Sequence, residues 1–510
     1  MAAEQAGVAD LLVRCLEREG VRVVFGIPGE ENIRFTDALA RSPIRYVLVR
    51  HEQAASFMAE IYGRLTGRAG VCSATLGPGA INLLLGTADA TTNSSPVVAV
   101  SAQVGLNRIY KESHQGVDLV AMFSPVTKWA ATVLTPGAVP EMIRKAFKLA
   151  QTERPGAVYL AVPEDVETMT TPPGLAPLNI NIPRPDMPSA AQIERAAAML
   201  NAARRPIVLA GHGAARAGAA GALRSFCGQL GLPAATTFHG KGVFPDDHPN
   251  ALGAVGFMRH DYVNFGFDEA DVIISVGYEL QEFDPARINP RRDKQILHLS
   301  RFPAEVDASY DVEVGIHADI SATLDALAAA TTRRWQPGTS GERIRALLAA
   351  ELARGAADDS FPLKPQRIVA DTRAALGRGD IVLADTGAVK MCGPAVSRLR
   401  AEHLPDLQRP VRHGLRPARR DRRQAGRARP PGTGRLRRRR IPDELPGDRD
   451  RLARAHPPDR PDLARRRLRA DQMEDGPRTR PRRRHRVLQP RLRGLRRKLR
   501  GPGLPGQFRW

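Results

Sequence analysis

The character of the chain changes abruptly at residue 392. Before that point, apolar segments alternate with amphipathic ones. After it there is no Tyr, a single Ile (Ile441), and no apolar periodicity over any useful window. Such a segment cannot bury enough apolar surface to offset the entropy that it loses on ordering. We therefore expect a folded body over residues 1–391 and a disordered, Arg/Pro-rich tail over residues 392–510.

The formal net charge of +22 comes from this tail. The tail contains 36 Arg and one Lys against 12 acidic residues, which leaves 39 basic and 42 acidic residues for the body. A tail of this charge would neutralise phosphates, so non-specific nucleic-acid binding is one functional hypothesis. Its aromatic residues are confined to the very end (Phe508 and Trp510). We therefore expect no specific nucleic-acid partner.

The sequence indicates a cytoplasmic protein. It has no basic-then-apolar run at the amino terminus and no stretch of 18 or more apolar residues, so neither a signal peptide nor a membrane span is expected. The four cysteines show neither metal-binding spacing nor a pairing pattern, which fits a reducing compartment (Cys15, Cys72, Cys227 and Cys392).

Helical and strand signals alternate along the body, which predicts an α/β fold. In residues 1–171 the clearest signals are a helix over Val8–Glu19 and strands over Val21–Phe25, Val97–Val100 and Val158–Val162. A Pro-rich linker, Pro172–Pro188, follows and reads as a domain boundary.

A second α/β unit is expected over residues 189–334, with strands at Ile207–Ala210 and Val272–Val276. The turn Gly211-His212-Gly213 after the first of these strands is either a structural turn or a cofactor contact. A third unit starts at residue 362 with a helix over Pro365–Leu376 and a strand over Ile381–Ala384, and its pattern stops at residue 391.

Five motifs follow one another in the first unit. They are V-F-G-I-P-G-E at Val24–Glu30, R-H-E-Q-A-A at Arg50–Ala55, T-L-G-P-G-A-I-N-L at Thr75–Leu83, A-M-F-S-P-V-T-K-W at Ala121–Trp129 and R-P-G-A-V-Y at Arg154–Tyr159. In this order and spacing, residues 5–391 resemble the catalytic large subunit of the thiamine-diphosphate-dependent acetolactate synthases. The fourth motif is closer to the catabolic, flavin-independent branch.

The resemblance implies a fold of three doubly wound parallel-sheet domains, of which the third is truncated here. Residues 1–171 would bind the pyrimidine of thiamine diphosphate, residues 189–334 would form the central domain, and residues 362–391 would begin the diphosphate-binding domain. The active site of this family lies between two subunits, so the resemblance also implies a homodimer or tetramer.

Glu52 is the first catalytic candidate. It follows an apolar strand (Tyr46–Val49) and precedes an Ala-rich helix, so it should lie at the carboxyl end of a strand, near a cleft. The resemblance implies that Glu52 hydrogen-bonds a ring nitrogen of the aminopyrimidine and favours the tautomer that takes the proton from the thiazolium carbon. The alternative is a solvated Glu favoured at a helix start by the dipole.

The other site candidates come from the same motifs. Gly77-Pro78-Gly79 should begin a helix whose free N–H groups hold a polar ligand, or else form a rigid turn. Gln115 stands where the synthases have a Gln that orients the bound intermediate, and Lys128 could meet a substrate carboxylate or be a surface Lys at a helix end. The residues expected to contact the cofactor are Pro28, Gly29, Glu52, Gly77, Pro78, Gly79, Asn82, Thr386 and Gly387.

The resemblance implies decarboxylation of one pyruvate and its addition to a second, which gives 2-acetolactate and CO₂. A thiamine-diphosphate-dependent 2-oxo-acid decarboxylase, or another lyase, is the alternative on the same scaffold. Decarboxylase relatives tend to have paired histidines early in the chain, whereas this sequence has His51-Glu52 there. Gln115 likewise favours carboligation.

Two cofactor expectations of the family fail in this sequence. Flavin-binding members have an Arg-containing motif where this chain has Gly277-Tyr278-Glu279-Leu280, so FAD is doubtful. The family's third domain carries G-D-G and a later Asn, which hold Mg²⁺ and through it the diphosphate. Residues 392–510 contain no G-D-G, and the nearest approach is Gly447-Asp448-Arg449. No metal ligand is therefore assigned, and the chain as encoded is expected to be inactive.

The composition of the tail suggests a frameshift just after Met391. Thirty-six Arg against one Lys is what GC-rich DNA gives when it is read out of frame. Back-translation of Gly432–Asp450, read one nucleotide later, can spell a segment that contains G-D-G. The wobble bases permit this reading but do not force it.

Overall fold

The computed structural model describes residues 7–181, 184–256, 261–336, 339–377, 380 and 382. All of them belong to the first of the two units into which the chain divides, Met1–Pro417. The expected strand at Ile381–Ala384 (apart from Val382), the candidates Thr386 and Gly387, and the tail over residues 392–510 lie outside the described residues. The expectation that the tail has no packed fold therefore stays a prediction.

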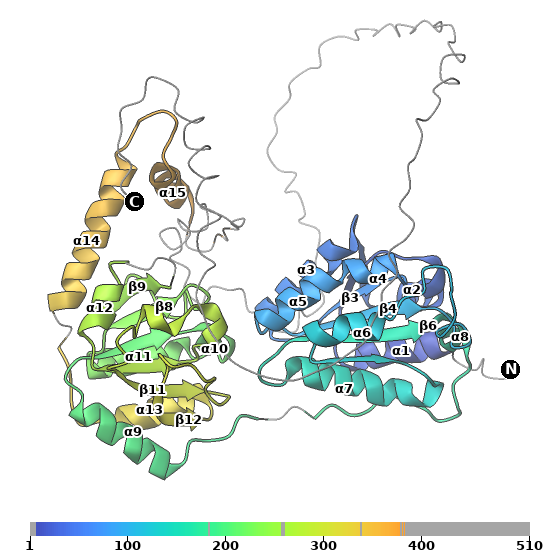
Figure 1. Cartoon of the computed structure of the whole chain (residues 1–510), viewed down its shortest axis with the longest axis horizontal. Coiled ribbons are helices and arrows are strands. Elements are labelled where there is room, and N and C mark those ends of the chain that lie inside the picture. The colour runs from blue at the N-terminus through green and yellow to red at the C-terminus, as the bar shows by residue number, and fades with distance from the viewer. Residues whose placement is uncertain are drawn as a thin grey trace, which may run out of the picture. The chain divides into compact units, whose positions relative to one another are not determined.

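The first sheet has six parallel strands in the order β2-β1-β3-β4-β6-β5 (Figure 1). Three of its inner strands (β3, β4 and β6) are buried along their whole length, as is typical of a parallel sheet covered on both faces. The strands are β1 (Val23–Gly26), β2 (Arg45–Leu48), β3 (Gly70–Ala74), β4 (Val97–Gln103), β5 (Trp129–Thr132) and β6 (Ala157–Pro163).

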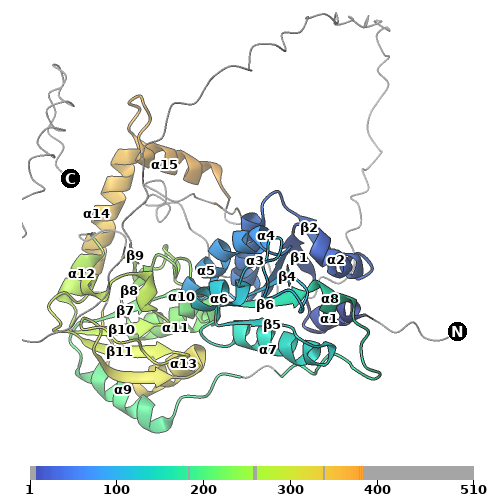
Figure 2. The same ribbon diagram turned by 45° about the vertical axis from the view of Figure 1, so that its right-hand side comes forward.

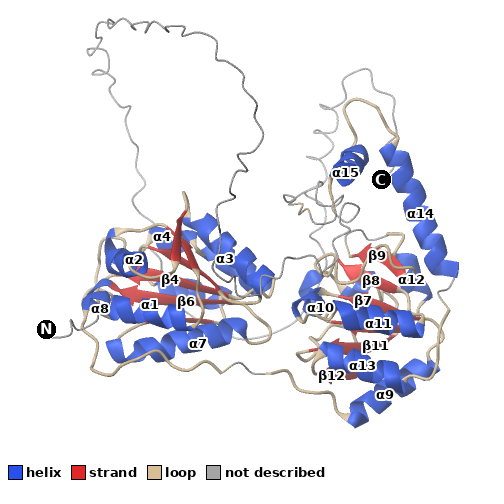
Figure 3. Ribbon diagram, turned by 180° about the vertical axis from the view of Figure 1, so that it is seen from behind, coloured by secondary structure: helices blue, strands red, loops and turns tan. Residues whose placement is uncertain are grey.

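Helices cover both faces of this sheet (Figure 3). Helix α1 buries Leu11, Leu12, Cys15 and Leu16 as one stripe and packs with α7 into one core cluster. Helices α3 to α6 supply the cluster on the other face. The helices are α1 (Val8–Arg18), α2 (Ile33–Ala40), α3 (Glu52–Thr66), α4 (Pro78–Asn82), α5 (Leu84–Thr92), α6 (Leu119–Phe123), α7 (Val139–Gln151) and α8 (Glu164–Thr168).

The second sheet is also six-stranded and parallel, in the order β12-β11-β10-β7-β8-β9. The strands are β7 (Pro206–Ala210), β8 (Ala234–Thr237), β9 (Ala251–Val255), β10 (Val272–Val276), β11 (Gln295–Ser300) and β12 (Val312–His317). The α-helices of this region are α9 (Ala190–Ala202), α10 (His212–Arg216), α11 (Ala220–Leu230), α12 (Asn264–Glu269) and α13 (Ile320–Ala330). Two further helices follow them, α14 (Thr339–Ala356) and α15 (Pro365–Ala375).

The α/β fold with parallel sheets is confirmed, and the expected elements shift by only a few residues. The strand expected at Val21–Phe25 is β1, and the one expected at Val272–Val276 is β10 without any change. The described residues of Pro172–Pro188 contain no helix or strand. Within the described part of the chain, no helix is both long and apolar enough to cross a membrane.

Candidate active site

The first three of the five motifs meet at the carboxyl edge of the first sheet. Strands β1, β2 and β3 pair in parallel, and Gly26 lies beside both Leu48 and Ser73 in the register. The loops that leave these three strands therefore emerge at the same edge. Each loop carries one motif, and two of them continue into α3 and α4, which contact each other (Figure 2). This edge is where parallel α/β sheets hold their ligands.

Glu52 is the first residue of α3, as the sequence predicted. The preceding residue, His51, caps the helix because its Nδ1 accepts the Gln53 N–H at 3.1 Å. The Asn82 side-chain amide donates to Glu52 Oε2 at 2.9 Å. A Cβ at Gly79 would lie 3.4 Å from Glu52 Oε1, so the Gly-Pro-Gly turn packs closely against this oxygen. The structure thus brings Glu52, Asn82 and Gly79 together from two motifs 30 residues apart.

Gln115 lies against the same turn. Gly77 has φ +52° and ψ −119°, and a Cβ at Gly77 would lie 2.5 Å from the Gln115 carbonyl oxygen and 2.8 Å from its Cβ. Only glycine fits a position that has both this φ and this close approach. Gln115 itself has φ +55°, which is uncommon for a residue with a side chain and costs on the order of 1 kcal/mol. Strained residues of this kind cluster at functional sites.

For Gly77-Pro78-Gly79 the hydrogen bonds favour the rigid-turn alternative. The N–H groups at the start of α4 were expected to be free for a ligand, but Pro78 has no N–H and the Gly79 N–H donates to the Leu76 carbonyl at 3.2 Å. Helix α4 has only five residues. The turn therefore shapes the site by close packing, and Asn82 acts on Glu52.

Pro28 and Gly29 lie in the loop after β1. The Gly29 N–H donates to Asn32 Oδ1 at 2.7 Å, and a Cβ at Gly29 would lie 2.4 Å from Thr75 Cβ. The Thr75 hydroxyl donates to Glu31 Oε2 at 2.6 Å. The first and third motifs are thus packed on each other, which explains why a glycine stands at position 29.

Lys128 is engaged elsewhere. Its Nζ donates to the carbonyl oxygens of Thr152 and Arg154 at 2.8 and 2.6 Å. These bonds fasten the segment that leads into β6. These bonds favour the structural alternative for Lys128, and a substrate contact stays an untested prediction.

Tyr46 is a site neighbour that the sequence analysis missed. Its hydroxyl lies 3.4 Å from Ser73 Oγ, and a Cβ at Gly26 would lie 2.6 Å from the same hydroxyl. Burial raises the pKa of Tyr46 above its usual value, and the nearby Glu52 carboxylate adds to the rise. The only signal in the sequence was a polar-tipped side chain within the apolar strand just before Glu52.

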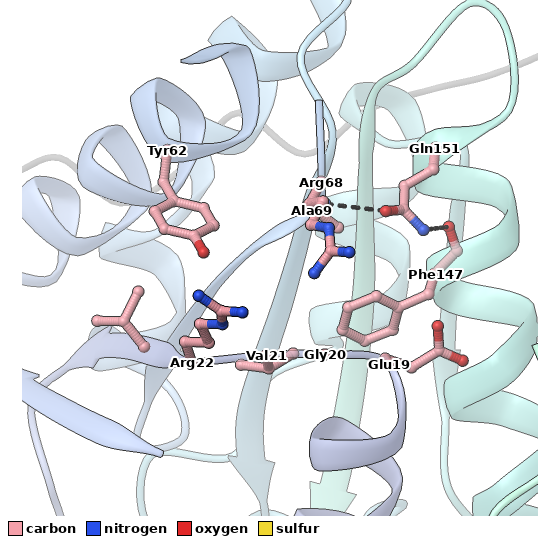
Figure 4. Close-up of a pocket in the computed structure, with 10 residues that line it drawn as sticks. Glu19, Gly20, Val21, Arg22, Tyr62, Arg68, Ala69, Phe147 and Gln151 are labelled. Carbon is pink, nitrogen blue, oxygen red and sulfur yellow. Dashed lines mark hydrogen bonds between the residues drawn. The ribbon is translucent and has the colours of Figure 1, made fainter. Parts of the chain in front are cut away.

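A hollow at the opposite edge of the sheet is not this site (Figure 4). It is lined by residues that precede β1 and β3, among them Arg22, Tyr62 and Arg68. Gln151 closes one side, because its Oε1 accepts the Ala69 N–H at 3.2 Å and its amide donates to the Phe147 carbonyl. In parallel α/β sheets, ligands bind at the carboxyl ends of the strands and not at this amino-terminal edge.

The described residues include no group of three or more His, Cys, Asp or Glu side chains that could hold a metal ion. The polar groups of the described site are the carboxylate of Glu52, the side-chain amides of Asn82 and Gln115, and the phenol of Tyr46. Such groups can hold and orient a polar heterocycle and share a proton with it.

Two family descriptions match the chain. Residues 7–122 match the N-terminal TPP binding domain of thiamine pyrophosphate enzymes, and residues 193–327 match the central domain of the same enzymes. The first match includes Glu52, Asn82 and Gln115.

Curated relatives carry acetolactate synthase names. A probable acetolactate synthase large subunit of Methanocaldococcus jannaschii is 35% identical over 393 residues, which is 74% of this chain and 65% of that protein. A protein of the same description from Methanococcus aeolicus is 32% identical over 75% of this chain and 67% of its own length. A catabolic acetolactate synthase of Raoultella terrigena is 36% identical over 71% of this chain and 65% of its own length. The chain thus matches about two thirds of the length of these relatives.

Proposed function

Because this chain belongs to the thiamine-diphosphate-dependent enzymes of the acetolactate synthase large-subunit family, we propose that its body is the pyrimidine-binding and central part of a carboligase. The reaction joins two pyruvate molecules into 2-acetolactate with loss of CO₂. The observation that carries the proposal is the carboxylate of Glu52, held by Asn82 at the carboxyl edge of the first sheet, with Gln115 against the adjoining turn.

The described residues fit one half of thiamine diphosphate. Glu52 has one carboxylate oxygen bound by Asn82, which leaves Oε1, beside Gly79, available to the cofactor. An aminopyrimidine presents a ring nitrogen that suits such a carboxylate. Of the other cofactor candidates, Thr386 and Gly387 fall outside the described part of the chain, and no residue of this chain is assigned to Mg²⁺.

Four side chains of the first domain act together with the cofactor in this proposal. Thiamine diphosphate, when bound, supplies the carbon nucleophile and the electron sink for decarboxylation. Glu52 holds the proton that is shared with the pyrimidine, and Asn82 fixes the direction of that carboxylate. Gln115 orients the bound substrate, the task that the resemblance implies for it. Tyr46, which is near Glu52, limits the access of water to that carboxylate.

Product analysis separates carboligation from decarboxylation. The protein to use is one in which the reading frame after Met391 has been restored, incubated with pyruvate, thiamine diphosphate and Mg²⁺. We expect acetolactate as the main product. Acetaldehyde as the main product would replace the proposal with the decarboxylase alternative.

The apolar surface of the first domain supports the proposed assembly into a dimer or tetramer. Met58, Ile61 and Leu65 form one stripe of α3 and are each more than 40% exposed, and Leu85 on the neighbouring α5 is 55% exposed. Helices α3 and α5 pack so closely that a Cβ at Gly86 would lie 2.2 Å from Ser56 Oγ. An exposed apolar patch of this kind marks an association surface.

We therefore expect the body, residues 1–391, to sediment as a dimer or larger assembly. Ile61→Lys should shift the species toward monomer, because an unpaired charge would be buried at the contact. Val306→Lys is the matched control, since Val306 is fully exposed in a loop of the central domain. A body that remains monomeric at high concentration in sedimentation velocity contradicts the assembly proposal.

A further inference from the structure

The second sheet has a topological switch point, and the crevice that such a switch point forms is where doubly wound sheets take dinucleotides. Its strand order places β7 beside β10, while β8 and β9 lie on one side and β11 and β12 on the other. The connections after β7 and β10 therefore lead away in opposite directions. In doubly wound sheets, this switch point at the carboxyl ends of the strands is the ligand position. Gly211-His212-Gly213 follows β7, and Gly277-Tyr278-Glu279 follows β10.

These two turns pack directly against each other and are joined by backbone hydrogen bonds. The Gly211 N–H donates to the Val276 carbonyl at 2.9 Å, and the Gly213 N–H donates to the Gly277 carbonyl at 2.7 Å. A Cβ at Gly277, which has φ +62°, would lie 2.2 Å from the Ala214 nitrogen. The glycines of the G-H-G turn are thus explained by backbone packing. This packing leaves no space between the turns for a pyrophosphate.

The Glu282 carboxylate accepts hydrogen bonds from two further N–H groups of these turns, those of His212 and Glu279. Glu282 ends the short 3₁₀ helix η4 (Leu280–Glu282). Its two oxygens accept the His212 N–H at 3.1 and 3.2 Å, and Oε1 also accepts the Glu279 N–H at 3.0 Å. Its Oε2 accepts the Thr237 hydroxyl, so it links the ends of β7, β8 and β10. Backbone N–H groups at such turns are the usual partners of a bound phosphate.

The charged groups around the crevice are also paired within the protein. The Arg216 guanidinium on α10 donates to Glu279 and to Glu153, and Glu279 is fully buried. The Ser94 hydroxyl donates to the same Glu279 carboxylate at 2.6 Å. Burial holds the pKa of the His212 imidazole well below its usual range, so this ring adds no positive charge at neutral pH. Among the described residues, Arg216 on α10 is thus already paired with protein carboxylates.

We propose that Glu282 fills the anion position of this crevice, and that the central domain is therefore closed without a flavin or nicotinamide dinucleotide. FAD, which some members of the family hold in this domain, does not fit the described residues. Glu282 occupies, from within the chain, the N–H donors of His212 and Glu279 that the phosphates of a dinucleotide would use, although burial raises the pKa of its carboxyl to about 7. It also cross-links three strand ends that a bound ligand would otherwise hold. This inference does not depend on the proposed carboligase activity.

Flavin binding and thermal unfolding of the full-length chain test the proposal. The purified chain is dialysed to equilibrium against FAD, and in parallel against NAD⁺, and we expect no ligand in excess of the free concentration. Glu282→Gln should lower Tm by about 4 °C or more, because the carboxamide has one acceptor oxygen in place of the two that accept hydrogen bonds from His212, Glu279 and Thr237. The matched control is Glu313→Gln on the exposed side of β12, which should stay within about 1 °C of the unaltered protein.

A second pair of variants keeps the test decisive if Glu282→Gln does not fold. Thr237→Val removes the hydroxyl that donates to Glu282 and should lower Tm, whereas Thr237→Ser keeps it and should not. Stoichiometric FAD binding by the unaltered chain would overturn the proposal. Equal Tm values for Glu282→Gln and Glu313→Gln, or for Thr237→Val and Thr237→Ser, would overturn it as well. Neither readout involves thiamine diphosphate, so failure here is distinct from failure of the proposed activity.

Discussion

Glu52→Gln should lower the turnover of the frame-restored protein by at least about two orders of magnitude, the scale expected when a proton-transfer partner is lost. Glutamine has nearly the same shape as glutamate. Its amide oxygen, placed where Glu52 Oε2 now lies, can still accept the hydrogen bond from Asn82. Glutamine cannot share a proton with the pyrimidine, because an amide does not ionise in this range. The loss should therefore appear in kcat, while the fold is retained.

The measurement is initial-rate acetolactate formation at saturating pyruvate, thiamine diphosphate and Mg²⁺. The matched control is Glu141→Gln, a change of the same type at an exposed residue of α7 on the opposite face of the sheet. The control should keep near-normal turnover. Near-normal turnover in Glu52→Gln itself would remove Glu52 from the proposed mechanism.

We expect the chain as encoded to bind thiamine diphosphate weakly, with or without Mg²⁺. The half of the cofactor with the highest charge is its diphosphate, which needs a hard cation held by oxygen ligands. Residues 392–510 contain no G-D-G, and Gly447-Asp448-Arg449 is the nearest approach. Loss of that anchor should cost several kcal/mol, which corresponds to about a thousandfold or more in Kd.

Calorimetric titration of the encoded chain with thiamine diphosphate, with and without Mg²⁺, tests this expectation. The frame-restored protein is the control, and it should show tight, magnesium-dependent binding. Tight, magnesium-dependent binding by the encoded chain would show that its tail builds a metal site, and the frameshift interpretation would then be wrong. Re-reading the gene across the codons for Lys390–Pro394 tests the same interpretation directly.

Local patterns determined most of the fold in advance. Apolar runs with glycine at their ends predicted β7 and β10, and the spacing of Leu11, Leu12, Cys15 and Leu16 predicted α1. These signals are reliable because a parallel strand buried on both faces needs a continuous apolar run, and an amphipathic helix needs a 3.6-residue period. The position of Glu52 at a strand-to-helix junction was set by the same local signals.

The sequence by itself determined the α/β class, the order of the motifs and the candidate Glu52. Only the tertiary structure decided which side chains meet. It placed Asn82 on Glu52 and Gln115 against Gly77, gave Lys128 two carbonyl acceptors, and seated Glu282 in the crevice of the second sheet. The reason is physical: element formation follows from periodicity over a few neighbouring residues. Contacts between loops 30 or more residues apart depend instead on how the crossover helices pack the strands side by side.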